Sequence, residues 1–175
     1  MGQEKKALEA TLAYEEAKKE LRKNLRRGSI INDNIFLASV YFRNNIFDKC
    51  KTLIQEILLE TTVIVNAPII IHANFLRACL NVLEGKRENA GLFLSKAKKE
   101  ISKSGVKDAY LEMFLDLMKR LLKSQWKIYD KEKYLNEVEK LEQLISNKNK
   151  VYNDLFFTLH DLQFFLREYS AMKER

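Results

Sequence analysis

Turn-forming residues are scarce in this chain. Its 175 residues include one proline and five glycines. An all-β protein of this size needs many more turn residues, because each pair of short strands is joined by a turn. The composition therefore predicts an all-α protein, and the length suits a single domain, residues 1–175, with one well-buried core.

Residues that carry catalytic or metal chemistry are also scarce. The two cysteines, Cys50 and Cys79, lie far apart on predicted helices, where a free cysteine behaves as a small buried hydrophobe. His72 has no histidine or glutamate at the helical spacing of a metal site, and His160 has only its sequence neighbour Asp161. The sequence has no glycine-rich phosphate loop, nucleophile elbow or Cys-x-x-Cys pair. We therefore predict a protein that is not an enzyme and has no cofactor or metal.

Long apolar runs are absent as well. The longest, residues 63–71, is interrupted by Asn66 and Pro68 and is too short to span a bilayer. The amino terminus has no signal-peptide pattern, because it runs directly into a charged helix. We therefore predict no membrane span, and a cytoplasmic location if the chain is complete. The location stays open if the chain is an excerpt of a longer precursor.

Apolar periodicity predicts helices along most of the chain. A first helix covers residues 4–27 and ends at Gly28. Two pairs of shorter helices follow at residues 30–60 and 68–103, each joined by a tight turn. Three longer helices follow within residues 106–173. The short connections are typical of an antiparallel helical array.

The two helix pairs share a pattern of small, apolar and turn residues. The positions are Leu37, Ala38, Tyr41, Asn45, Phe47, Cys50, Ile54 and Ile57 in the first pair, and Ala78, Gly85, Ala90, Leu94 and Ala97 in the second. They resemble tetratricopeptide (TPR) repeats, which have small residues where two helices cross and a turn residue between them. The resemblance covers about a third of the chain, and the step from Ala38 to Ala78 is longer than the repeat length of about 34 residues.

The resemblance implies a right-handed solenoid of helical hairpins in which the first helix of each hairpin lines a concave groove. By position, the groove residues are Asn32, Ile35, Ser39, Phe42, Arg43, His72, Phe75, Cys79 and Val82. Such a groove is mostly apolar, with Arg43 and His72 as its polar points, and suits an amphipathic helix or an extended apolar segment of a partner protein. The alternative is that Ile35, Phe42, Phe75 and Val82 are ordinary core residues.

The last predicted helix has more apolar residues than one buried face requires. Leu155, Leu159, Leu162, Leu166 and Tyr169 form one stripe, while Phe157 and Phe164 lie on another face beside Asp161. Either the helix is buried in its own fold, where it caps the array or fills the groove, or Phe157 and Phe164 dock on a partner or a second copy of the chain.

The chain is basic, with a formal net charge of +7. Helical spacing groups six basic residues on one broad surface: Lys18, Lys19, Arg22, Lys23, Arg26 and Arg27. We predict a non-catalytic protein-interaction scaffold or adaptor, whose partner is another protein or a second copy of the chain. The alternative is a nucleic-acid-associated helical protein that uses this basic surface. Salt distinguishes the two, because phosphate contacts weaken steeply as salt rises and apolar docking does not.

Overall fold

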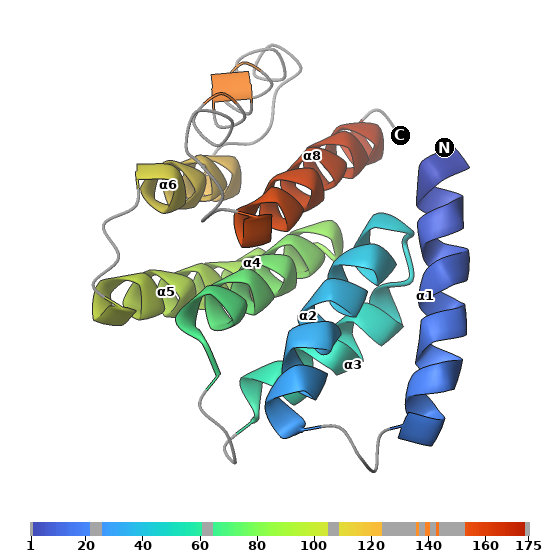
Figure 1. Ribbon diagram of the computed structural model, residues 1–175. Coiled ribbons are helices and arrows are strands. Elements are labelled where there is room, and N and C mark those ends of the chain that lie inside the picture. The colour runs from blue at the N-terminus through green and yellow to red at the C-terminus, as the bar shows by residue number, and fades with distance from the viewer. Residues whose placement is uncertain are drawn as a thin grey trace.

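A computed structural model describes residues 2–21, 26–60, 65–104, 109–123 and 153–173, together with positions 136, 139, 140 and 143. The described residues form helices and connecting turns and contain no strand, so the predicted all-α class is confirmed. The helices are α1 (Gly2–Leu21), α2 (Arg27–Arg43), α3 (Phe47–Leu58), α4 (Ala67–Leu83), α5 (Arg87–Ser104), α6 (Ala109–Lys123) and α8 (Asn153–Lys173) (Figure 1). None of the described helices is long and apolar enough to cross a membrane.

Helices α2 and α3 form one hairpin, and α4 and α5 form a second with the same turn geometry. Asn45 and Gly85 both have a left-handed backbone, with φ of 60° and 76°. Each is followed by a residue whose N–H bonds back into the last turn of the first helix, which is the Schellman ending of a helix. The equivalent bonds are Asn45 N–Phe42 O (3.1 Å) and Ile46 N–Tyr41 O (2.9 Å), and Gly85 N–Val82 O (3.0 Å) and Lys86 N–Asn81 O (2.7 Å).

The two hairpins also bury equivalent residues where their helices cross. Small side chains there allow the helix backbones to approach closely. The buried positions are Ala38, Cys50, Ile54 and Ile57 in the first hairpin, and Ala78, Ala90, Leu94 and Ala97 in the second. The predicted turns are therefore confirmed in both hairpins, and the residues predicted to lie at the helix crossings are buried.

The predicted end of the first helix is wrong. We expected residues 4–27 to be helical and Gly28 to cap them, but α1 ends at Leu21 in the described part of the chain. Arg26 is extended, with φ of −65° and ψ of 139°, and its carbonyl accepts the first hydrogen bonds of α2. Gly28 therefore lies in the first turn of α2. The extended backbone at Arg26 and the place of Gly28 within α2 are incompatible with one helix that runs from residue 4 to a cap at Gly28.

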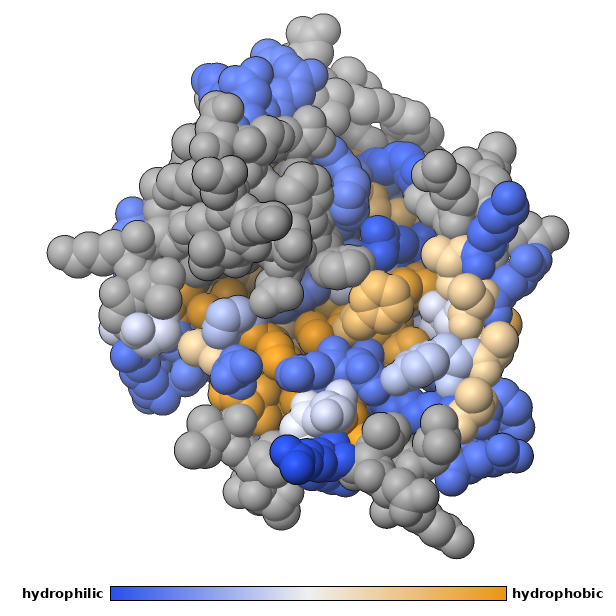
Figure 2. Space-filling view, in the orientation of Figure 1, coloured by the Kyte–Doolittle hydropathy of each residue, from blue (hydrophilic) through white to orange (hydrophobic). Residues whose placement is uncertain are grey.

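The described hydrophobic core is continuous from α2 to α8. Helix α8 lies across α2 and α4, and α6 lies beside α5 (Figure 1). Figure 2 shows apolar residues gathered in the middle of this side of the molecule, with hydrophilic residues around them. The middle of the three predicted C-terminal helices falls largely outside the described residues.

Candidate functional site

The two helices predicted to line a groove, α2 and α4, both contact α8. Most of its predicted residues are buried: Ser39, Phe42, His72, Phe75, Cys79 and Val82. Ile35 and Arg43 are half-buried, and Asn32 is exposed. Of the alternatives that the sequence left open for the last helix, the structure supports burial in its own fold, because α8 contacts α2 and α4. The core alternative is confirmed for Phe42, Phe75 and Val82.

One carboxylate of α8 joins it to both hairpins. The Ser39 hydroxyl of α2 donates a hydrogen bond to Asp161 Oδ2 over 2.7 Å, and His72 Nε2 of α4 lies 2.7 Å from the same oxygen. Arg43 Nε of α2 is 3.4 Å from the other oxygen, Asp161 Oδ1, as an ion pair. Asp161 is 3% exposed. We call these four residues the Asp161 cluster.

The Asp161 cluster has the residue types of a serine-hydrolase triad but lacks its geometry. In a triad the histidine faces serine with one ring nitrogen and aspartate with the other. Here His72 Nε2 faces both, at 3.2 Å from Ser39 Oγ and 2.7 Å from Asp161 Oδ2. The serine proton goes directly to the carboxylate, so the imidazole does not activate the hydroxyl. The arrangement places both Ser39 and His72 against one oxygen of the carboxylate.

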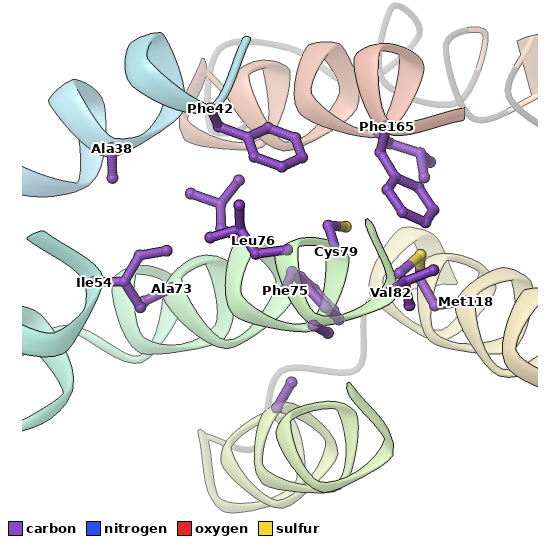
Figure 3. Packing of buried hydrophobic residues seen from close by; sticks show 14 of the residues in the cluster. Ala38, Phe42, Ile54, Ala73, Phe75, Leu76, Cys79, Val82, Met118 and Phe165 are labelled. Carbon is purple, nitrogen blue, oxygen red and sulfur yellow. The ribbon is translucent and has the colours of Figure 1, made fainter. Parts of the chain in front are cut away.

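Aromatic side chains also pack between α8 and the hairpins. Phe42 of α2 and Phe164 of α8 meet edge to face, with ring centroids 5.2 Å apart. Figure 3 shows Phe42 and, from α8, Phe165 projecting toward the α4 residues Leu76 and Cys79. Further along α8, the Tyr169 hydroxyl accepts a hydrogen bond of 3.0 Å from Arg87 of α5. The contact between α8 and the hairpins therefore combines apolar packing with buried polar contacts.

The predicted C-terminal interface needs a correction at Phe164. Its side chain is 4% exposed and belongs to the core, so it does not form an exposed docking face for a partner. Its position on α8, one turn after Asp161, turns it toward α2. The side chain of Phe157 lies outside the described residues.

The predicted basic surface is smaller than the helical spacing indicated. Lys18 is buried, and its Nζ lies 3.4 Å from Asp33 Oδ2 and 3.3 Å from Asn34 Oδ1 of α2. It therefore anchors α1 to α2 and is unavailable to an external phosphate, which corrects the prediction. Arg22 and Lys23 lie outside the described residues.

The other basic residues of that surface are exposed, and two of them form ion pairs. Lys19 Nζ is 2.8 Å from Glu16 Oε2, and Arg27 Nε is 2.6 Å from Glu60 Oε2. Arg26 is exposed in the connection before α2. Because α1 ends before Arg27, the predicted row of basic residues at four-residue spacing does not continue along one helix. In the described part of this surface, the basic residues therefore do not form the continuous row that the helical spacing predicted for phosphate binding.

Asp161 is the functional candidate that sequence reasoning missed. The sequence analysis considered it only as the neighbour of His160 and of the face with Phe157 and Phe164, and gave it no role; the His160 side chain is exposed and lies near Gln163. The available signal was a single acidic residue among the apolar residues of the last helix. A charge on a face that is otherwise apolar requires a buried partner. The described residues contain no group of three or more His, Cys, Asp and Glu side chains that would hold a metal.

Comparisons of the chain with protein-family models, with curated proteins and with solved structures gave no match. A functional proposal for this chain therefore depends on the geometry of the α2–α4 face and its contacts with α8.

Proposed function

We propose that this chain is a non-catalytic protein-interaction scaffold whose α2–α4 face binds an amphipathic helix of a partner protein. The supporting observation is that this face already accommodates a helix. It contacts α8 through both a buried hydrogen-bonded carboxylate and an edge-to-face phenylalanine pair. An apolar groove with a few convergent polar groups is the usual receptor for an amphipathic helix.

The proposal includes a TPR-like arrangement of the two hairpins. The supporting observations are the equivalent turns at Asn45 and Gly85, and the equivalent buried crossings at Cys50 and Ala90. In such an array, successive first helices lie side by side and present one continuous face. Here α2 and α4 are in contact, and both contact α8.

We also propose that the protein works in a reducing compartment such as the cytoplasm. Both cysteines are free and buried. Burial raises the pKa of the Cys50 and Cys79 thiols, which keeps them protonated and unreactive. Such thiols pack as small apolar groups and need no oxidising environment.

Affinity capture from host lysate with the full chain as bait, followed by washes of rising salt, tests this function. The matched variants are Ile35→Gln, at a half-buried position of the α2–α4 face, and Leu92→Gln, at an exposed position of α5. We expect the wild type and Leu92→Gln to retain the same defined protein at high salt, and Ile35→Gln to retain less of it. Retention of nucleic acid alone, released at moderate salt, would favour the basic-surface alternative and overturn the proposal.

A further inference from the structure

We infer that the α2–α4 face selects partner helices that carry an acidic residue, and that α8 is a tethered competitor for such partners. This inference rests on the proposed function and adds the chemistry of the partner. The occupant to which it commits is a helix of another protein with an acidic side chain at the place of Asp161 and aromatic side chains three and four residues later. In α8 those residues are Phe164 and Phe165.

Charge complementarity on the face supports an acidic partner. Ser39, Arg43 and His72 converge from two helices on a single point, where they meet one carboxylate. Helix α4 has no acidic residue, and Asp33 is the only one in α2. Asp33 is engaged on the α1 side, where it accepts a hydrogen bond from Tyr14. The two helices therefore offer donors at the groove and no carboxylate of their own to satisfy them.

Burial makes these donors selective. Ser39 is fully buried and His72 nearly so under α8, so a covering helix excludes water from both. A helix without an acidic residue at this place leaves the donors covered and without a strong acceptor, which opposes binding. A helix whose acidic residue lies in another register also leaves Ser39 and His72 covered and without a carboxylate. The face therefore discriminates by residue type and by position.

The spacing within α8 defines the motif that fits. Asp161, Phe164 and Phe165 are three and four residues apart, which places them on one side of a helix. Phe164 meets Phe42, and Asp161 meets the donors one turn earlier. A partner helix with this spacing reproduces both contacts. Because α8 belongs to the same chain, it competes at an effective concentration on the order of millimolar.

A labelled peptide with the sequence of residues 153–173 is the probe, and fluorescence anisotropy against the full chain measures its affinity. We expect weak binding to the wild type, since α8 occupies the face. In the full chain, Asp161→Arg weakens the intramolecular contact, and we expect it to bind the peptide about tenfold more tightly or better. Glu168→Arg, which makes the same charge change at a half-buried position of α8, is the matched control and should behave as the wild type.

The peptide itself carries the test of selectivity. Against the Asp161→Arg chain, the peptide variant Asp161→Ala should bind about 30-fold more weakly or worse, because the donors lose their carboxylate. A chain that combines Asp161→Ala with Arg43→Glu should bind the peptide variant Asp161→Arg better than the wild-type peptide, because its own α8 carries no charge to pair with Glu at position 43. Equal affinity for acidic and neutral peptides would overturn the inference, and the capture of a partner protein at high salt would still support the proposed function.

Two further measurements keep the inference falsifiable. If circular dichroism shows that the Asp161→Arg chain does not fold, the isosteric Asp161→Asn chain replaces it with the same expected order of affinities. Absence of peptide binding to every folded chain would overturn the inference. Light scattering determines the mass of each chain. A dimer that the free peptide dissociates would show that α8 exchanges between two copies, and would replace the partner helix with a second copy of the chain.

Discussion

Replacing the buried carboxylate of α8 tests the structural basis of these proposals. Asp161→Asn keeps the size of the side chain and removes its charge. An amide oxygen at the Oδ2 position still accepts from Ser39 and His72, whose distances to that oxygen are both 2.7 Å. An amide NH₂ at the Oδ1 position faces the guanidinium of Arg43, 3.4 Å away in the wild type. Two charge-assisted hydrogen bonds become neutral ones, and one ion pair is lost.

The magnitude follows from these three contacts. A hydrogen bond to a charged group contributes about 1.5–3 kcal/mol and a neutral one about 0.5–1.5 kcal/mol, so each of the two bonds loses about 1 kcal/mol. The lost ion pair adds about 1 kcal/mol, and the expected decrease in the free energy of unfolding is about 3 kcal/mol. The lower desolvation cost of an amide opposes this decrease. We expect the weaker hydrogen bonds and the lost ion pair to outweigh this gain in desolvation, because Arg43 keeps its charge and loses Asp161 as its acidic partner.

Urea denaturation followed by circular dichroism measures this decrease, and a thermal scan should show a midpoint lower by about 6–12 °C. Asp116→Asn is the matched control, since Asp116 lies on the exposed side of α6. We expect the control to stay within about 0.5 kcal/mol of the wild type. If Asp161→Asn changes stability no more than the control does, the carboxylate does not hold α8 to the hairpins.

A turn, a helix crossing and a surface ion pair provide three further tests. Gly85→Ala places a side chain at φ of +76°, so denaturation should show a loss of about 1–2 kcal/mol; an unchanged stability would contradict the left-handed turn. Ala90→Leu adds volume at a fully buried position and should lower the free energy of unfolding by about 1–3 kcal/mol in the same assay. An unchanged stability would contradict close packing at this position. Lys51 lowers the pKa of the Glu84 carboxyl group through a hydrogen bond, so their pair stabilises the fold above the ordinary pKa of Glu84 and is lost as pH falls through the lowered value. Lys51→Gln should therefore flatten the decrease of stability in acid, and an unchanged pH profile would refute this.

The local features of this fold were predictable from the sequence. A left-handed turn requires glycine or asparagine, and both Gly85 and Asn45 occur where apolar periodicity breaks. A close helix crossing requires small residues, and Cys50 and Ala90 follow these turns by the same five positions. Such features involve residues within a few positions of one another, so the pattern of one hairpin is enough to identify them.

The features that depend on contacts between distant segments were not predictable in the same way. Lys18 looked like a surface residue because its partners, Asp33 and Asn34, belong to the next helix. Ser39 and Asp161 are separated by 122 positions, and the sequence does not say which of several apolar faces α8 covers. The resemblance drew attention to residues of α2 and α4, and these two helices contact α8, but the helix that packs there and the residue that holds it required the packed structure.

A buried carboxylate is a costly way to stabilise a helix contact within one chain. An apolar side chain at the position of Asp161 avoids the desolvation of a charge, and apolar replacements of buried ion pairs are often neutral or stabilising. A carboxylate beside Ser39, His72 and Arg43 adds discrimination, because only an acidic residue in one register accepts from Ser39, meets His72 and pairs with the Arg43 charge. Discrimination between helices has little value for a helix that is already tethered to the face. It has value when other helices compete for the same place, which is the situation of a protein-interaction scaffold.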